Sequence, residues 1–321
     1  MTLISALVCL LALQAGCSVE DLATEQRAQR GLVIVLPGIE GRSVWNVNIA
    51  RGLDEGGFKG AIEIFDWGTA VPGGAIINLT DLERNRLVAQ QLKRRIMRYR
   101  RQQPGRPVHL VGHSGGAGVA LLTIEDLPRD APLTSAILLA AAVSPTHDLR
   151  CALRRTEYGI FNYYSPYDKG FLVLGTGLFG TIDRQHGAAA GAVGFKKPMG
   201  MDEEDAAVYD KLHQIKWKSE MRRQGHYGGH MGWASREFVR DVLAPLINSL
   251  KPIERSGPGF RSEKRDREQE TDEGRREKRP VGRPERKPAG KPDKRELLAP
   301  DAASGEGALV RRALSGAFGS E

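Results

Sequence analysis

The sequence predicts an α/β protein with a largely parallel sheet, and three observations carry this prediction. From Gly31 to about Ile253, short runs rich in Val, Ile and Leu alternate with longer amphipathic segments. Several of the short runs are continuously apolar, as expected for strands that helices cover on both faces. Of the 321 residues 40% are hydrophobic, which is enough to build a core and excludes a wholly disordered chain.

The first 17 residues have the pattern of an export signal. An apolar run from Leu3 to Leu13 is too short to cross a bilayer as a helix, and small residues and Cys17 follow it. The segment resembles a bacterial lipoprotein signal, although Gln14 stands where that family has an aliphatic residue and no Lys or Arg precedes the run. The resemblance implies an exported protein of the cell envelope with a lipid on Cys17 that anchors it to the membrane. A simple secretory signal and a misassigned start codon remain the alternatives.

The three cysteines, Cys9, Cys17 and Cys151, supply neither a disulfide framework nor a four-cysteine zinc module. Once a signal is removed, Cys151 has no partner within the chain, and we expect it to be a small buried apolar residue. Residues 18–30 are polar and predict a short tether between the signal and the folded body.

The body, residues 31–253, is predicted to contain six strands with helices between them. The apolar runs predict strands at Leu32–Leu36, Ala61–Phe65, Val108–Val111, Ser135–Ala140, Gly159–Tyr164 and Gln214–Lys218. The amphipathic segments that read as helices are Ser43–Asp54, Asp81–Arg101, Gly116–Asp126, Glu203–Leu212 and Ser235–Leu250. Arginines between the apolar positions of the second helix are expected on its solvated face.

The charge of the chain does not indicate a nucleic-acid partner. The net charge of +8 divides into +5 over residues 1–253 and +3 over residues 254–321, where 17 Lys and Arg face 14 Asp and Glu. This last segment has almost no large apolar residue before position 305, so we expect a charged, Pro-rich disordered tail. Its Val281-Gly282-Arg283-Pro284 lacks the arginine that an AT-hook has before the glycine.

The strongest chemical signal is Gly112-His113-Ser114-Gly115-Gly116, a G-x-S-x-G directly after a predicted strand and directly before a predicted helix. In this context the serine lies on a tight strand-to-helix turn that exposes its hydroxyl, and the glycines leave room for the turn. The positive end of the helix favours negative charge that develops at the site. We therefore predict that Ser114 is a nucleophile; the alternative is a Gly-rich structural turn.

A serine nucleophile needs a base, and the base needs an acid to orient it. Asp168 follows the strand Gly159–Tyr164 and is our first choice for the acid, with Asp148 as the second choice. Two histidines in Gly225-His226-Tyr227-Gly228-Gly229-His230 follow the last strand. His230 is our first choice for the base and His226 the second, because the Gly-Gly before His230 lets the loop bend toward the serine.

These motifs resemble those of the α/β-hydrolase superfamily over residues 31–251. The resemblance implies a minimal, lipase-like fold of about six mostly parallel strands, since two strands usual at the start of that fold have no counterpart here. Leu36-Pro37-Gly38-Ile39-Glu40-Gly41 matches the loop after the first core strand. By this resemblance the backbone N–H groups of Ile39 and Gly115 would form the oxyanion hole, although an ordinary Gly/Pro turn is the alternative for this loop.

No cofactor or metal is predicted. Gly175-Thr176-Gly177-Leu178-Phe179-Gly180 is a literal G-x-G-x-x-G with Asp202 downstream, but neither a helix nor a strand pattern follows it as dinucleotide binding requires. Residues 169–200 read instead as a long loop that shapes the substrate pocket. The pair His226 and His230 lacks an H-E-x-x-H pattern, and glycines separate the two rings, which argues against a metal site.

The sequence thus favours a serine hydrolase that acts on carboxylic esters, small-molecule or lipid, through an acyl-enzyme. Thioester or amide hydrolysis and acyl transfer remain open, because the same triad performs them. A catalytically silent hydrolase fold that serves as a binding or scaffold protein at the cell envelope is the alternative from another class.

Overall fold

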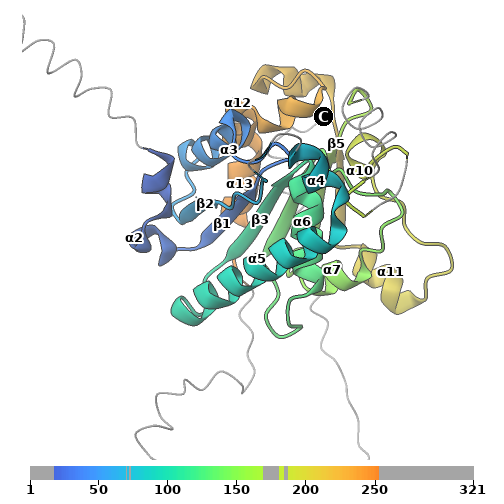
Figure 1. Ribbon diagram of the computed structural model, residues 1–321, viewed down its shortest axis with the longest axis horizontal. Helices are drawn as coiled ribbons and strands as arrows, with labels where there is room; N and C mark the ends of the chain where they lie inside the picture. Colours follow the sequence, from blue (N-terminus) through green and yellow to red (C-terminus); the bar gives the residue numbers. More distant parts are fainter. Residues whose placement is uncertain (1–17, 70, 72–73, 169–180, 184–186, 253–321) are drawn as a thin grey trace, which may run out of the picture. The chain divides into compact units, whose positions relative to one another are not determined.

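The computed structural model of the protein describes residues 18–252 except 70, 72–73, 169–180 and 184–186. Its centre is a six-stranded, all-parallel sheet with the strand order β2-β1-β3-β4-β5-β6 (Figure 1). The strands are β1 Leu32–Leu36, β2 Ala61–Ile64, β3 Val108–His113, β4 Ser135–Leu139, β5 Ile160–Tyr164 and β6 Leu212–Lys216. The predicted α/β class is confirmed: six parallel strands form one sheet, and helices cover both of its faces.

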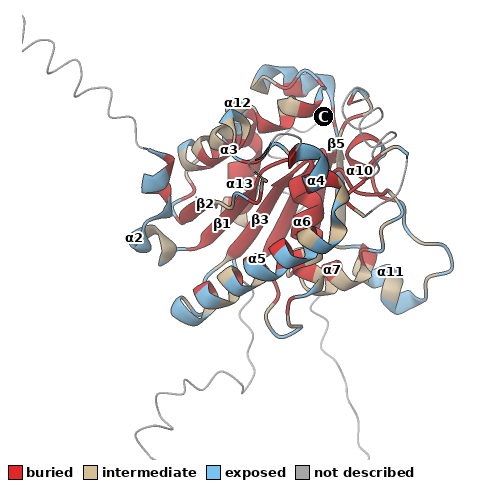
Figure 2. Cartoon of the chain, in the orientation of Figure 1, coloured by how far each residue is buried: buried red, intermediate tan, exposed pale blue. Residues whose placement is uncertain are grey.

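The alternation of side chains along each strand explains why both faces are covered. On β1, Leu32, Ile34 and Leu36 belong to one core, while Val33 and Val35 belong to the other. All five are fully buried, so the strand reads as a continuous apolar run rather than as an alternating one. Figure 2 shows the same result for the whole sheet, whose central strands are buried while the helices around it are exposed on their outer faces.

The helices divide between the two faces. Against the core that contains Val33 lie α3 Val44–Glu55, α12 Arg236–Phe238, a π-helical turn Val239–Leu243 and α13 Ala244–Ser249. Against the core that contains Leu32 lie α5 Leu82–Gln102, α6 Gly115–Glu125 and α7 Arg150–Arg154. Shorter elements at the edges are α4 Gly74–Thr80, α10 Ala190–Val193, α11 Glu203–Tyr209 and the 3-10 turns Ser219–Gln224 and His230–Ala234.

The last two predicted helices differ from the structure. The helix expected over Glu203–Leu212 ends at Tyr209, because the chain turns there and Leu212 already begins β6. The helix expected over Ser235–Leu250 is broken into α12, the π-helical turn and α13. Pro245 has no amide hydrogen, so the regular hydrogen-bond pattern cannot continue through that position.

Residues 18–30 are folded onto the body, which corrects the prediction of a polar tether. They form a 3-10 turn, Val19–Ala23, and α2, Glu25–Ala28. Val19 and Leu22 are buried in the core on the α3 side of the sheet. The Arg27 guanidinium donates to the carbonyl oxygens of Phe58 at 2.9 Å and Gly60 at 2.8 Å, and it pairs with Asp54 at 2.8 Å. Two apolar side chains among many polar ones were too weak a periodic signal to predict this.

The arginine-rich helix α5 has the solvated face that the sequence predicts. Arg86 pairs with Glu83, Lys93 with Asp126 and Arg95 with Glu63, while Leu92 and Ile96 are buried on the opposite side of the helix.

The predicted tail, residues 254–321, and the signal with Cys17 lie outside the described residues. In the part of the chain that the structure describes, no helix is both long and apolar enough to span a bilayer.

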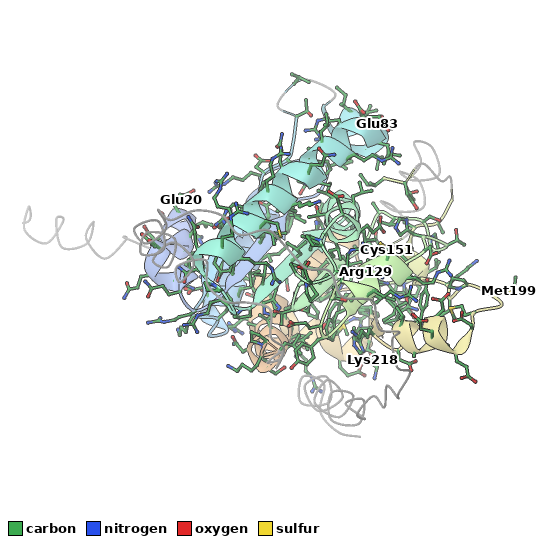
Figure 3. The ribbon with its side chains drawn as sticks, turned by 90° about the horizontal axis from the view of Figure 1, so that it is seen from below. Glu20, Glu83, Arg129, Cys151, Met199 and Lys218 are labelled. Carbon is green, nitrogen blue, oxygen red and sulfur yellow. The ribbon has the colours of Figure 1, made fainter. Side chains whose placement is uncertain are left out.

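Cys151 lies on α7 (Figure 3) and is half-buried, whereas the sequence predicts a buried residue. Its thiol donates to the carbonyl oxygen of Glu125 at 3.6 Å. Arg155 packs beside the sulfur from one helical turn later and donates to the Cys151 carbonyl at 3.1 Å. These contacts hold the end of α6 against α7 and are of a structural kind.

Candidate active site

Ser114 lies between the last residue of β3 and the first residue of α6, at the carboxyl edge of the sheet. Its φ of 53° and ψ of −118° are values that a residue other than glycine rarely adopts. Two hydrogen bonds, one to the last residue of β4 and one to the chain after it, hold this conformation: Ser114 N–H donates to the Leu139 carbonyl at 2.9 Å, and Ala142 N–H donates to the Ser114 carbonyl at 3.1 Å. The serine therefore stands on the strained turn that the G-x-S-x-G pattern predicts.

Packing explains two glycines of this motif. A Cβ on Gly112 would lie 2.7 Å from the carbonyl oxygen of Gly116, inside the turn itself. A Cβ on Gly116 would lie 2.3 Å from the carbonyl oxygen of Pro37, in the loop after β1. Real Cβ atoms do not approach oxygen so closely, so larger residues at these positions would push the turn open or push α6 away from β1.

Asp168 and His230 form a buried pair at the same edge of the sheet. Their side chains are joined by a hydrogen bond of 2.6 Å between His230 Nδ1 and Asp168 Oδ2, and the two residues are 5% and 2% exposed. Asp168 follows β5, and its N–H donates to the Ser165 carbonyl at 3.1 Å. The Ser165 hydroxyl in turn donates to the Gly228 carbonyl at 2.6 Å, which joins the turn that carries Asp168 to the loop that carries His230.

His113 connects the histidine loop to the nucleophile turn. Its Nε2 lies 3.3 Å from the carbonyl oxygen of His230, so Nε2 carries the hydrogen and donates. The centroids of the two imidazole rings are 4.9 Å apart. Burial, together with the neighbouring His230, lowers the pKa of His113 to about 3, so His113 stays neutral. Because His113 directly precedes Ser114, this contact joins the loop that carries His230 to the turn that carries the serine.

The second-choice histidine, His226, has a different environment. It is fully buried, its Nδ1 accepts a hydrogen bond from Gly228 N–H at 3.0 Å, and its ring packs edge-on against Trp233 with centroids 4.0 Å apart. Burial lowers the pKa of His226 to about 3. A neutral ring that is enclosed by Trp217, Trp233 and Phe238 has the environment of a residue that supports the loop.

The second-choice acid, Asp148, lies at the surface and forms an ion pair with Arg150. The hydrogen bond from that guanidinium holds the pKa of Asp148 below its ordinary value. The structure thus pairs Asp168 with His230 at the edge of the sheet where Ser114 lies, and it gives Asp148 another partner.

Asp183, another carboxylate after these strands, also has its own partner. Its carboxylate contacts His147 Nδ1 at 3.2 Å, and His147 Nε2 contacts Glu125 at 2.6 Å. Burial would lower the pKa of His147, but the hydrogen bonds to Asp183 and Glu125 raise it to about 10. His147 is therefore a charged link between two carboxylates, and neither ring nitrogen is free to act as a base.

The two predicted oxyanion-hole amides lie close together. A methyl group in place of a Gly115 hydrogen would be 3.5 Å from the Ile39 nitrogen. Within the described part of the chain, neither the Ile39 nor the Gly115 N–H has an acceptor. The Gly115 amide also opens the first turn of α6, where the helix dipole favours negative charge. Two unengaged donors next to Ser114 can stabilise an oxyanion.

No cofactor or metal site emerges from the described residues. The G-x-G-x-x-G at 175–180 lies outside them, and so do residues 169–174 and 184–186 of the loop expected to shape the pocket. Asp202 caps α11, where its side chain accepts a hydrogen bond from Asp205 N–H at 2.8 Å. No group of three His, Cys, Asp or Glu side chains in the ranges that are described could hold a metal ion.

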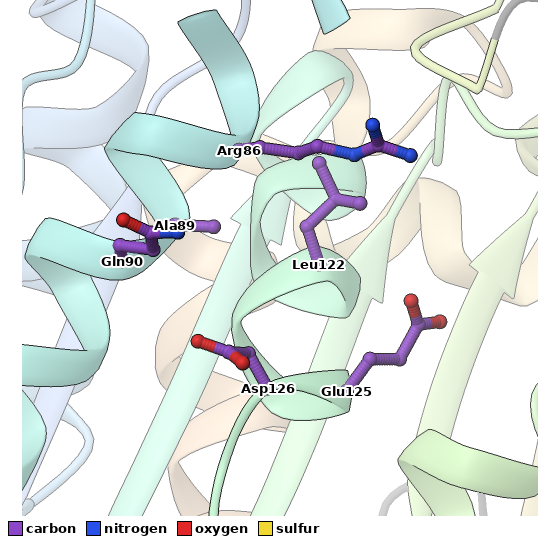
Figure 4. A pocket seen from close by; sticks show the side chains of 6 residues that line it. All are labelled: Arg86, Ala89, Gln90, Leu122, Glu125 and Asp126. Atoms are coloured by element: carbon purple, nitrogen blue, oxygen red, sulfur yellow. The ribbon is translucent and has the colours of Figure 1, made fainter. Parts of the chain in front are cut away.

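A surface hollow of about 290 Å³ lies between α5 and α6 (Figure 4), at the end of α6 that is remote from Ser114. It is lined by Arg86, Ala89, Gln90, Leu122, Glu125 and Asp126. Figure 4 shows the Arg86 side chain extending from α5 over Leu122 of α6. The lining has no nucleophile, and it shares no residue with the candidate active site.

No protein-family model matches the sequence, and no curated protein matches it. The fold is similar to a hydrolase of the α/β superfamily from Xanthomonas campestris pv. campestris, with 16% identity over 69% of this chain and 100% of that one, and a TM-score of 0.39. A cutinase-like protein from Cryptococcus sp. has 16% identity over 70% of this chain and 95% of that one, with a TM-score of 0.34. An extracellular α/β-hydrolase from a Paenibacillus species has 12% identity over 67% and 97%, with a TM-score of 0.34. Similarity at this level says nothing about activity or substrate.

Proposed function

We propose that this protein is a serine hydrolase that cleaves carboxylic esters through an acyl-enzyme. The observation that carries the proposal is the buried 2.6 Å hydrogen bond between Asp168 and His230, at the same edge of the sheet as a serine on a strained strand-to-helix turn. Such a hydrogen bond has one main chemical use at this place: it fixes the imidazole tautomer and stabilises the imidazolium that forms when the ring accepts a proton.

In the proposed mechanism His230 Nε2 takes the proton of the Ser114 hydroxyl as its oxygen attacks the ester carbonyl. The resulting oxyanion accepts hydrogen bonds from the Ile39 and Gly115 amides. The tetrahedral intermediate collapses, the alcohol leaves with the proton from His230, and the acyl group stays on Ser114. Water then enters, His230 takes one of its protons, and a second tetrahedral intermediate releases the carboxylic acid and restores the serine.

The test compares wild-type protein with Ser114→Ala on p-nitrophenyl esters of increasing acyl length. Wild-type protein should release p-nitrophenol and should be labelled covalently by a fluorophosphonate probe, and Ser114→Ala should do neither while it unfolds at the same temperature. Full turnover by the variant would refute the assignment of the nucleophile. A folded wild-type protein that neither reacts with the probe nor hydrolyses any ester would favour the silent binding-protein alternative.

We further propose export and a lipid on Cys17, on the strength of the sequence pattern of residues 1–17. Val19 already packs in the core, so only Ser18 would separate such a lipid from the folded body, and the active protein would be held directly against the membrane surface. Intact-mass analysis of protein extracted from membranes should show a diacylglyceryl adduct on a chain that begins at Cys17. A chain that begins at another residue would contradict the anchor.

A further inference from the structure

The loop after β1, residues 37–41, carries the Ile39 amide, and side chains from outside the loop hold its backbone. The Trp67 indole N–H donates to the Pro37 carbonyl at 2.8 Å. The Asn78 side-chain amide donates to the Ile39 carbonyl at 2.8 Å. Between these two, the Gly38 carbonyl accepts from Gly41 N–H at 3.1 Å. We call this segment the oxyanion loop, because the proposed function gives its Ile39 amide that role.

Three consecutive carbonyl groups of the oxyanion loop therefore each accept a hydrogen bond. A peptide unit is planar, so a fixed carbonyl also fixes the N–H group at the other end of the same plane. The Gly38 carbonyl shares its plane with the Ile39 N–H, and the planes on either side are fixed by Trp67 and Asn78. Rotation of the Ile39 amide out of the site would break at least one of these hydrogen bonds, so the direction of this donor is set before any substrate binds.

The orientation of the Asn78 amide follows from its partners. Its Oδ1 accepts from the Thr69 N–H at 3.2 Å and from the Thr69 hydroxyl at 2.7 Å. Because a backbone N–H can only donate, the oxygen faces Thr69 and the NH₂ group faces the Ile39 carbonyl. Asn78 is 1% exposed, so water does not compete for these bonds. The Asn78 side chain thus uses both its oxygen and its NH₂ group in buried hydrogen bonds, which join Thr69 to the oxyanion loop.

Trp67 acts from the other side of the same loop. It is 3% exposed, and a Cβ on Gly115 would lie 3.4 Å from its ring and 2.6 Å from the Ile39 side chain. The indole thus touches the loop through its N–H and faces Gly115, the second donor, through its ring. It spaces the two amides as well as orienting the first.

We propose that Asn78 and Trp67 are positioning residues, which preorganise the oxyanion loop so that the Ile39 amide points at the developing negative charge. This inference rests on the proposed function and adds to it two residues that do not touch the substrate. Preorganised donors stabilise the transition state more than the ground state, and a misplacement of about 1 Å can cost roughly 100-fold in rate. Loss of either contact should therefore lower kcat and leave KM nearly unchanged.

The test uses two variants that keep shape and remove one donor each. Asn78→Asp keeps the oxygen that faces Thr69 and replaces the NH₂ group with a second oxygen, and Trp67→Phe keeps an aromatic ring and removes the N–H. The matched control is Asn162→Asp, which changes another fully buried amide, on β5, away from the oxyanion loop. We expect kcat to fall about 10- to 100-fold in the first two variants and KM to stay within about twofold, whereas the control should lose only thermal stability.

Two further readouts separate positioning from general damage to the fold. The rate ratio between an oxoester and the matching thionoester reports on hydrogen bonds to the carbonyl oxygen, because sulfur accepts such bonds weakly; the ratio should fall in Asn78→Asp and Trp67→Phe and stay unchanged in Asn162→Asp. In addition, a protonated carboxyl group at position 78 can donate to the Ile39 carbonyl again. The kcat of Asn78→Asp relative to wild type should therefore rise as the pH falls from 8 to 5.

An active wild-type enzyme with an unchanged ester ratio in both variants would overturn the positioning role and leave the proposed function standing. A drop of the ratio in Asn162→Asp equal to that in the other two would overturn it as well, since the effect would then follow from lost stability alone. Should Asn78→Asp fold poorly, Trp67→Phe decides the question by the same ratio. A wild-type protein without esterase activity would refute both the positioning role and the proposed function.

Discussion

Asp168→Asn is the substitution that tests the proposed charge arrangement most directly. The asparagine has the same shape, but its NH₂ group would donate to Nδ1 of His230 and force the hydrogen onto Nε2, the atom that must accept the serine proton. At the observed N–O distance of 2.6 Å and an effective dielectric constant of about 20, the attraction between carboxylate and imidazolium is about 6 kcal/mol. The asparagine keeps a hydrogen bond to the ring, and this bond offsets part of the lost attraction. We therefore expect kcat/KM to fall by about 10³- to 10⁴-fold, equivalent to about 4 to 5.5 kcal/mol.

The assay is steady-state hydrolysis of a short p-nitrophenyl ester at pH 8, with Asp148→Asn as the matched control. Asp148 is exposed and paired with Arg150, so its variant should keep activity within about twofold of wild type, as surface ion pairs contribute little. Because Asp168 and His230 are buried, the loss in Asp168→Asn should persist in 1 M salt. A small effect of Asp168→Asn together with a large effect of Asp148→Asn would refute the assignment of the acid.

Three more outcomes follow from the structure. His230→Gln should lower kcat at least about 10³-fold in ester hydrolysis. His226→Gln should keep activity within about tenfold of wild type and lower the melting temperature in thermal unfolding. Equal losses of activity in the two variants would contradict this. The folded-state pKa of His147 is raised to about 10 from 6.5, so its stabilising effect is complete below pH 6.5 and disappears as the pH rises toward 10. Urea unfolding should show wild-type stability falling toward that of His147→Gln by at most about 1.4 kcal/mol per pH unit in this window, and a constant difference would be inconsistent with a charged His147. Leu22→Ala should lower the free energy of unfolding by about 2 to 4 kcal/mol, while no change would mean that residues 18–30 are a tether after all.

Strong local patterns made most of the fold predictable. The strands around the site are continuous runs of branched apolar residues, and the observed β1 has the bounds that the sequence predicted. The segment Asp81–Arg101 became α5, Leu82–Gln102, with Asp81 as its N-cap. Patterns with few apolar residues were less informative. The helix α4 and the buried 3-10 turn Val19–Ala23 were both missed, because each places only two or three side chains in the interior.

The site shows the same division between local and long-range information. The strained turn at Ser114 depends on neighbours within a few residues, so the motif and its flanks were sufficient to predict it. The pairing of Asp168 with His230 spans 62 residues, and the sequence could order the candidates without showing which side chains meet. Asn78 and Trp67 carry no motif at all, and only their hydrogen bonds to the oxyanion loop reveal them.

By itself the sequence determined the parallel α/β class and the turn that carries Ser114, because periodicity and short motifs encode backbone geometry locally. For the acid and the histidine it supplied only ranked candidates. The tertiary structure alone decided which acid and which histidine lie against each other, that residues 18–30 join the core, and which side chains hold the loop that carries Ile39. These outcomes depend on hydrogen bonds and burial between segments far apart in the chain. At the site, the parallel sheet supplies this proximity, because it brings the carboxyl ends of its strands to one edge.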